Sequence, residues 1–149
     1  MAELLLDAML GKLATYLRMC GHDAAYALDE GVEADGALLD WAASEDRQLV
    51  TRDAELAARA ADGVLLASRE VEAQLRELAA VGLDLELTDE PVRCGVCNGS
   101  LSRVGPGKAT PAYAPDTTEV AVWRCRDCGQ HFWRGSHWDD VARTLSRLG

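Results

Sequence analysis

Long hydrophobic runs are missing from this sequence of 149 residues. No apolar stretch approaches the roughly 18 residues of a transmembrane helix. The first residues also lack the basic segment and apolar region of a secretory signal peptide. We therefore expect a cytoplasmic protein without membrane contact. Aromatic residues make up only 5% of the chain, but hydrophobic residues make up 48%, which favours a packed core over disorder.

Basic residues are few, and their distribution predicts two domains. The net charge is −10, and lysine supplies only 2 of the 15 basic residues. Residues 1–88 contain 7 basic and 18 acidic residues, whereas residues 89–149 contain 8 and 7. The change in composition predicts one domain over residues 1–88 and a smaller one over residues 89–149.

The acidic net charge argues against nucleic acid as a partner, because like charges repel at long range. Two interpretations weaken that argument. Clustered carboxylates serve as metal ligands in some sites. Alternatively, the whole surface is acidic because the protein works at high salt, where screening is strong, and the scarcity of lysine fits this second interpretation.

Residues 1–82 alternate between strand and helix patterns. Strands are expected at residues 3–6, 23–28, 48–51 and 64–67, and each precedes an apolar pattern with helical spacing. Such alternation predicts a parallel sheet with helices on both faces. Ser68 is expected to cap the fourth helix. Cys20 lies on the apolar stripe of the first helix, so we expect it in the core.

The C-terminal unit shows weaker patterns. Residues 104–117 are expected to form a loop, residues 119–124 a strand, and residues 130–134 its hairpin partner. Ser136 and Asp139 have the spacing of a capping box. They predict the start of a last helix, which has one apolar face containing Trp138 and Leu148.

Four of the five cysteines form two C-x-x-C pairs. Cys94 and Cys97 make the first pair, Cys125 and Cys128 the second, and 27 residues lie between them. Without a secretory signal, this pattern favours zinc over disulfides. Four thiolates close the tetrahedral shell, which predicts a structural ion. His131 and His137 are then expected at the surface or in packing.

The zinc unit has two candidate roles. It holds the last helix onto the first domain, or it captures RNA. Trp123, Phe132 and Trp133 lie near Arg124, Arg126 and Arg134, a mixture that is typical of surfaces that bind single strands. The same aromatic residues are also what a small ribbon needs for its own core, and the sequence leaves both interpretations open.

Acidic residues stand where strands of the predicted sheet end. Asp7 follows the first strand, Asp53 follows the third, and Asp35 begins the helix between them. Open parallel sheets bind ligands at this edge, and carboxylate oxygens suit Mg²⁺ or Mn²⁺. Lys12 and Arg52 are placed to bind phosphate or to pair with these acids. A plainer role for Asp35 and Asp53 is that of helix N-caps.

Several motifs together resemble the Mut-7 C-terminal RNase domain family, which has a PIN-like fold and a C-terminal zinc ribbon. The segments that carry the resemblance occur in the family's order and span nearly the whole chain. They are residues 7–14 (DAMLGKLA), 17–23 (LRMCGHD), 49–53 (LVTRD), 93–99 (RCGVCNG) and 133–138 (WRGSHW).

The resemblance implies an α/β fold with a PIN-like parallel sheet flanked by helices, then a small zinc ribbon and a C-terminal helix. It implies a ribonuclease in which Asp7, Asp35 and Asp53 hold Mg²⁺ or Mn²⁺ and activate water. Glu55 is a candidate fourth acid, and Asp40 is the fallback for Asp35. Two other hypotheses stay open: an adaptor that binds RNA or a protein partner without catalysis, and a toxin-like nuclease with a cognate inhibitor.

Overall fold

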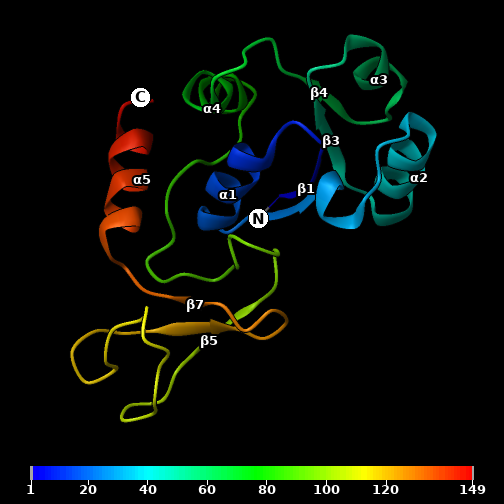
Figure 1. Ribbon diagram of the computed structural model, residues 1–149. Coiled ribbons are helices and arrows are strands. Elements are labelled where there is room, and N and C mark those ends of the chain that lie inside the picture. Colours follow the sequence, from blue (N-terminus) through cyan, green and yellow to red (C-terminus); the bar gives the residue numbers. More distant parts are fainter. Residues whose placement is uncertain (1, 149) are drawn as a thin grey trace.

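A computed structural model describes residues 2–148. The predicted α/β fold is confirmed: a parallel sheet is flanked by helices and followed by a small antiparallel sheet and a C-terminal helix (Figure 1). The first part comprises β1 (Glu3–Leu6), α1 (Gly11–Met19), β2 (Asp23–Tyr26), the short 3₁₀ helix η1 (Ala27–Glu30), α2 (Asp35–Glu45), β3 (Gln48–Thr51), α3 (Ala54–Arg59), β4 (Gly63–Leu65) and α4 (Val71–Ala80). The second part comprises β5 (Leu101–Arg103), β6 (Trp123–Cys125), β7 (His131–Phe132) and α5 (Ser136–Ser146).

The four strands of the parallel sheet lie in the order β2-β1-β3-β4. Leu5 of β1 is in register with Ala25 of β2 on one side and with Leu49 of β3 on the other. β1 and β3 are therefore neighbours in the middle of the sheet. Their carboxyl ends meet at one edge, so the residues that follow them are brought together.

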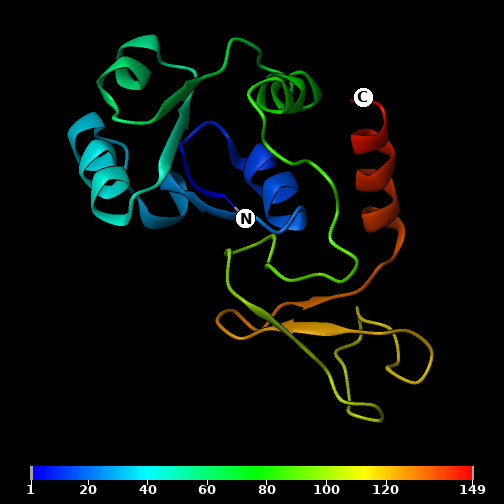
Figure 2. The same cartoon turned by 180° about the vertical axis from the view of Figure 1, so that it is seen from behind.

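Successive leucines of β1 face opposite sides of the sheet and belong to two separate cores. Leu4 and Leu6 pack with residues of α1 and α4, whereas Leu5 packs with residues of α2 and α3. Figures 1 and 2 show these helix pairs on the two faces of the sheet. A sheet covered on both faces needs apolar strands, which explains the uninterrupted Leu4-Leu5-Leu6 run.

Helix α5 packs against the parallel-sheet unit. Leu145 on α5 and Leu148 just beyond it are partly buried against the core of α1 and α4. Arg147 also bonds the Glu72 carboxylate of α4 at 2.9 Å. The C-terminal helix therefore returns to the first unit after the ribbon (Figure 2). This arrangement is what the first candidate role of the zinc unit requires, namely holding the last helix onto the first domain.

The ribbon also contacts edge strand β2 through Asn98, the residue after Cys97. The Asn98 side chain accepts a hydrogen bond from the Ala24 amide at 3.0 Å and donates one to the Asp23 carboxylate at 2.6 Å. Arg18 of α1 donates to the Gly95 carbonyl at 3.1 Å and to the Ala24 carbonyl at 2.9 Å. These bonds cover part of the open edge of the sheet, where free backbone groups otherwise invite pairing with another chain.

Four predicted strands differ from those observed. The hairpin partner predicted over residues 130–134 is shorter and spans His131–Phe132. The strand predicted over residues 23–28 ends at Tyr26, because η1 turns the chain and Gly31 closes that turn with φ of 68°. The strand predicted over residues 119–124 starts only at Trp123, since the Asp116 carbonyl accepts bonds from the Glu119 and Val120 amides in a turn. The fourth strand is Gly63–Leu65, not residues 64–67. Strand β5 was not predicted.

Both predicted serine caps are wrong. The N-cap of α5 is Gly135, not Ser136, and no side chain caps that helix. The N-cap of α4 is Glu70, while the Ser68 amide donates to the Glu77 carboxylate at 3.1 Å. Helix α4 begins at Val71, which packs against the core of α1 and α4, whereas α5 begins at Ser136, which is exposed.

Cys20 is 1% exposed, so its predicted place in the core is confirmed. Burial, together with the charge of Asp84, raises the pKa of Cys20 to about 12, so it stays a neutral thiol. Residues 83–92 form no helix or strand. The division into residues 1–88 and 89–149 stays a prediction. No helix within residues 2–148 has the length and apolar character needed to cross a membrane.

Candidate functional site

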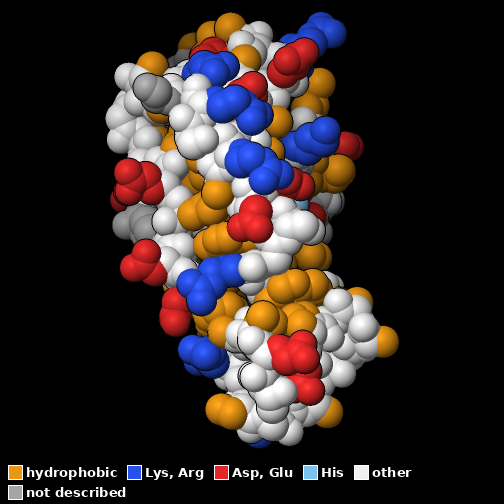
Figure 3. All heavy atoms as spheres, turned by 90° about the vertical axis from the view of Figure 1, so that its left-hand side faces the viewer, with side chains coloured by type: hydrophobic (Ala, Val, Ile, Leu, Met, Phe, Trp, Pro, Cys, Tyr) orange, Lys and Arg blue, Asp and Glu red, His pale blue; other side chains and the backbone are white. Residues whose placement is uncertain are grey.

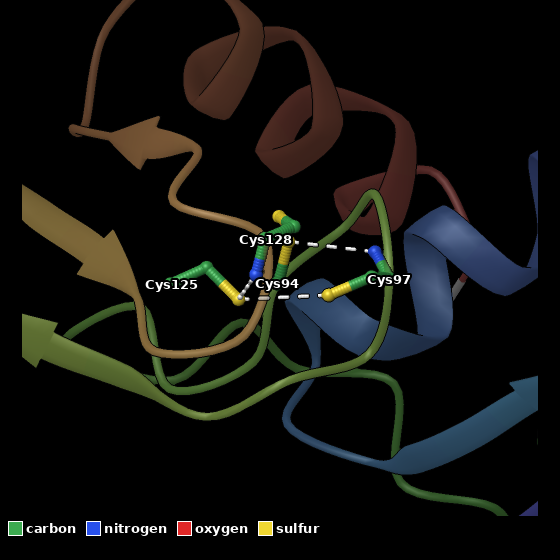
Figure 4. A group of neighbouring side chains, drawn as sticks. All are labelled: Cys94, Cys97, Cys125 and Cys128. Carbon is green, nitrogen blue, oxygen red and sulfur yellow. Dashed lines mark hydrogen bonds between the residues drawn. The ribbon is translucent and has the colours of Figure 1, made fainter.

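The four cysteines of the two C-x-x-C pairs form a compact cluster (Figure 4). Their Sγ atoms all lie within 4.8 Å of one another. Cys94 Sγ lies 3.6 Å from Cys128 Sγ, and Cys97 Sγ lies 3.5 Å from Cys125 Sγ. These separations suit four thiolates around one tetrahedral ion such as zinc. Neither His131 nor His137 belongs to the cluster.

Backbone amides turn towards the first sulfur of each pair. Cys94 Sγ accepts from the Val96 and Cys97 amides at 3.3 and 3.4 Å. Cys125 Sγ accepts from the Asp127 and Cys128 amides, both at 3.4 Å. Burial alone would raise the pKa of Cys125, but these amides, together with the Cys97 and Cys128 side chains, outweigh it and lower the pKa to about 7. Burial dominates at Cys94 and raises its pKa. The two turns therefore direct their sulfur atoms to one point, where they would bind an ion that prefers thiolate ligands.

The two turns share a backbone conformation that the sequence partly signals. Asn98 and Gly129, each the residue after a C-x-x-C pair, have φ of 72° and 81°. Asparagine and glycine are the residues that tolerate this left-handed region. Gly99 has a different constraint, because a Cβ there would lie 2.8 Å from Cys125 Sγ. A larger residue at position 99 would therefore push the two turns apart.

The acidic edge of the parallel sheet is organised by Thr51, the last residue of β3. Its hydroxyl donates to Asp7 Oδ2 at 2.7 Å and accepts from the Asp53 amide at 3.0 Å. Thr51 is fully buried. One side chain thus links the residues that follow β1 and β3. No role was expected for Thr51, although its position between a buried strand and Asp53 was an available signal.

The two acids make different bonds at this edge. Asp7 is half-buried, and its Oδ1 accepts from the Ala8 amide at 2.7 Å. Asp53 is exposed and caps α3, because its Oδ1 accepts from the Glu55 and Leu56 amides at 3.0 and 3.2 Å. The N-cap role considered for Asp53 is therefore confirmed. It leaves Asp53 Oδ2 without a hydrogen bond to any described residue.

A depression of about 240 Å³ lies at this edge and is lined by Asp7, Met9, Leu10, Arg52 and Asp53. The Arg52 Nε atom is buried without a hydrogen-bond partner, and no other side-chain atom in residues 2–148 shares that condition. A buried donor left unpaired costs free energy, on the order of 1–3 kcal/mol. Arg52 is therefore a group with unused donor capacity beside two acids.

The other predicted site residues lie outside this depression. Asp35 begins α2 and is half-buried, but it does not cap the helix, whose N-cap is Ala34. Lys12 is exposed in the first turn of α1. The alternatives Asp40 and Glu55 are also exposed. Within residues 2–148, the four cysteines are the only group of three or more His, Cys, Asp or Glu side chains close enough to share an ion.

Tyr26, at the end of β2, holds the turn that follows Asp7. Its hydroxyl donates to the Ala8 carbonyl at 2.6 Å. Burial and the charges of Asp29 and Asp7 raise the pKa of Tyr26, which keeps this donor protonated. A Cβ on Gly11 would lie 3.1 Å from the Tyr26 hydroxyl, so the turn and the ring are in close contact.

A larger depression of about 460 Å³ lies along β2, between that strand and the first cysteine turn. Its two arginines are already paired: Arg18 with Asp29 at 3.3 Å, and Arg47 with Asp23 at 2.9 Å. Neither Asp7 nor Asp53 lines it. The smaller depression is therefore the better candidate for chemistry, since unpaired polar groups meet there.

The ribbon aromatic residues divide between core and surface. Trp123 is 3% exposed and lies under the guanidinium groups of Arg103 and Arg134, 5.4 and 5.6 Å from the ring centroid. Phe132 and Trp133 are half-buried. The core interpretation is thus confirmed for Trp123, whose ring is closed to stacking with a base.

Comparison with known proteins assigns the family. The model of the Mut7-C RNAse domain matches residues 2–145, essentially the whole chain. Neither the comparison with curated proteins nor that with solved structures finds a match. The family name gives the chain a nuclease-like function with RNA as substrate. The family suggested by the sequence motifs is confirmed, and the chain belongs to the Mut7-C RNAse domain family.

Proposed function

We propose that the protein is a ribonuclease that hydrolyses RNA phosphodiester bonds with Mg²⁺ or Mn²⁺ at the acidic edge of its parallel sheet. One observation carries this proposal. In a chain of an RNase domain family, Asp7 and Asp53 follow adjacent parallel strands and line the same depression. Ligands of open parallel sheets bind at this edge.

The donors at the edge fit a hard divalent ion. Mg²⁺ binds through one or two carboxylates and keeps water or substrate phosphate as its other ligands. Asp7 and Asp53 would hold the ion, with Asp53 Oδ2 free of other bonds. Asp35 would be a further ligand of the ion, although it lies at the start of α2 and does not line the depression. When bound, such an ion lowers the pKa of water and neutralises charge on a phosphoryl oxygen.

The chain's own residues supply positioning. Thr51 fixes the Asp7 carboxylate through the 2.7 Å bond to Oδ2. Arg52 would donate its unpaired Nε–H to a phosphate oxygen, which would satisfy the buried donor. Lys12, in the first turn of α1, would attract the next phosphate along the strand. The cysteine cluster would hold zinc and keep the ribbon folded, since ion binding and folding are coupled in such sites.

The acidic net charge does not cover every face of the molecule. Figure 3 shows the side on which α5 lies, with Lys and Arg side chains interspersed with Asp and Glu along it and hydrophobic side chains gathered above the ribbon. Arg143 and Arg147 of α5 have side chains that are 67% and 57% exposed and pair with Asp140 and Glu72, so this face carries charges of both signs. RNA would approach such a face without facing the full repulsion that the net charge suggests.

Cleavage by Asp7→Asn tests the proposal. With zinc loaded, we expect the wild type to cleave single-stranded RNA only when Mg²⁺ or Mn²⁺ is added. Asp7→Asn should lower the rate at least about 100-fold, as loss of a group acting on the transition state does, while circular dichroism stays unchanged. Asp116→Asn is the matched control, because Asp116 is exposed in the ribbon loop and bonds only its own turn.

Cleavage by Asp7→Asn at the wild-type rate would overturn the site. RNA binding by the wild type without any turnover dependent on a divalent ion would instead favour the adaptor hypothesis. Both outcomes are read from one experiment if binding is followed by fluorescence anisotropy of the same labelled RNA.

A further inference from the structure

Met9 is the most exposed large hydrophobic residue in residues 2–148, at 72%, and it lines the acidic depression. It stands two residues after Asp7, in the turn between β1 and α1. We infer that Met9 is a substrate-contact residue that packs on an unpaired nucleobase next to the scissile phosphate, so that the enzyme acts on single-stranded RNA. This inference rests on the proposed ribonuclease function.

The exposure of Met9 is imposed by a well-anchored turn. The Leu10 amide donates to the Asp7 carbonyl at 3.0 Å, and the Ala8 carbonyl accepts from Tyr26 at 2.6 Å. The Leu10 side chain occupies the core and is 2% exposed. Met9, between these anchors, points away from the core. Covering this apolar side chain with a ligand would remove it from water, which is favourable.

The other groups at the depression favour a nucleotide as the covering group. Arg52 has an unpaired buried Nε–H that suits a phosphate oxygen. The N-terminus of α1, beside Met9, has neither a side-chain cap nor an acidic residue in its first turn, so its amides also favour an anion. The phosphate would thus contact Arg52 and the amides of α1, while the base would contact the apolar side chain of Met9 beside them.

The chemistry of the lining predicts weak base preference. Leu10 and Met9 are apolar, and the three remaining lining residues are two acids and an arginine. No asparagine, glutamine, serine or threonine lines the depression to hydrogen-bond a base edge. Contact with a thioether uses the face of a base, and every base has one. The depression of about 240 Å³ is also smaller than the roughly 300 Å³ at which small-molecule sites begin.

A base face is accessible only when the base is unstacked, which duplex RNA prevents. We therefore expect single-stranded RNA to be cleaved faster than the same sequence in a duplex. We also expect similar rates for oligonucleotides that differ only in the base beside the cleaved bond.

The test pairs a protein substitution with a substrate change. Met9→Ser should lower kcat/KM for a labelled single-stranded oligoribonucleotide about 2- to 10-fold, the range for a lost sulfur–ring contact, and mainly by raising KM. Met9→Leu keeps the apolar bulk but loses the sulfur, so its kcat/KM should fall between those of Met9→Ser and the wild type. Val81→Ser is the matched control, because Val81 is 64% exposed at the C-terminal end of α4 and does not line the acidic depression. Replacing the flanking nucleotide by an abasic one should abolish the difference between Met9→Ser and wild type.

The outcomes separate the inference from the function on which it rests. Divalent-dependent cleavage by the wild type with an unchanged kcat/KM in Met9→Ser would overturn the inference and leave the ribonuclease proposal standing. A Met9→Ser defect that persists at full size on the abasic substrate would also overturn it, because the lost contact would not be with a base. Absence of any cleavage by the wild type would overturn both.

Discussion

The four clustered cysteines lie in two short turns, whereas Asp7 and Asp53 follow separate strands of the parallel sheet. Each turn shapes itself through its own amides, which bond the first sulfur of the pair. At the acidic edge, local amides bond Asp7 and Asp53 separately, but no single turn brings the two acids together. The geometry of this edge depends on Thr51, on the register of β1 with β3, and on Tyr26 from a third strand.

This difference predicts how each region fails. The cysteine cluster has four donors directed at one centre, so its fold should depend on the ion. The acidic edge keeps its bonds through protein groups alone, so the sheet should persist without a divalent ion. Loss of its ion should therefore unfold the cysteine cluster, whereas loss of the divalent ion should abolish activity at the acidic edge without unfolding it.

Removal of zinc should have the largest effect. Stripping the ion with a chelator, or Cys94→Ser, should unfold the ribbon while the parallel sheet remains folded. Hydrogen exchange should show lost protection over residues 94–138 and retained protection in β1 and β3. Removal of Mg²⁺ and Mn²⁺ alone is the control and should change neither. Equal loss of protection in both regions would contradict the comparison.

Thr51→Val should have the next largest effect. The substitution keeps the shape of a fully buried side chain but removes the bonds to Asp7 Oδ2 and the Asp53 amide. We expect kcat to fall about 10-fold or more, because Asp7 loses its orientation. Chemical denaturation should show a loss of about 1–3 kcal/mol. Wild-type kcat despite that loss would mean that Thr51 supports only the fold.

Tyr26→Phe should have a smaller effect at the same edge. It removes only the hydroxyl that holds the Ala8 carbonyl at 2.6 Å. We expect a loss of about 1 kcal/mol in stability and a several-fold lower kcat with little change in KM. Tyr113→Phe is the matched control, because its hydroxyl bonds His131 in the ribbon. A similar kcat defect in both variants would show that the effect is not specific to the turn.

The smallest expected effect concerns the contact between the ribbon and strand β2, and the pH dependence of that contact. Partial burial alone would raise the pKa of Asp23, but hydrogen bonds from Arg47 and Asn98 outweigh it and lower the pKa. A lowered folded-state pKa contributes stability above the unfolded value of about 3.9, and this stability is lost as pH falls through the folded pKa. In Asp23→Asn, the free energy of unfolding should therefore fall less steeply as the pH is lowered through the acid range. An unchanged dependence on pH would refute the role of Asp23.

The sequence predicted those features that depend on local pattern. The Leu4-Leu5-Leu6 run predicted a buried strand because a sheet covered on both faces requires it, and the C-x-x-C spacing predicted the cysteine cluster. The sequence did not predict features that depend on packing between distant residues. Ser68 and Ser136 have the chemistry of caps, yet Glu70 and Gly135 occupy the N-cap positions.

The acidic edge could be predicted only in part. Asp7 and Asp53 follow strands, so their shared edge follows from topology. The bonds of Thr51 and Tyr26 could not be read from the sequence, because they join residues 44 and 18 positions apart. The exposure of Met9 was equally hidden, since an apolar residue in an apolar stretch ordinarily suggests core.

Calorimetric titration of the zinc-loaded protein with Mn²⁺ tests the central claim most directly. We predict one site or a pair of sites in the wild type, strongly weakened in both Asp7→Asn and Asp53→Asn. The control Asp116→Asn should bind as the wild type does, and circular dichroism should be unchanged in all four proteins. Equal Mn²⁺ affinity in the wild type and in Asp7→Asn would contradict the account.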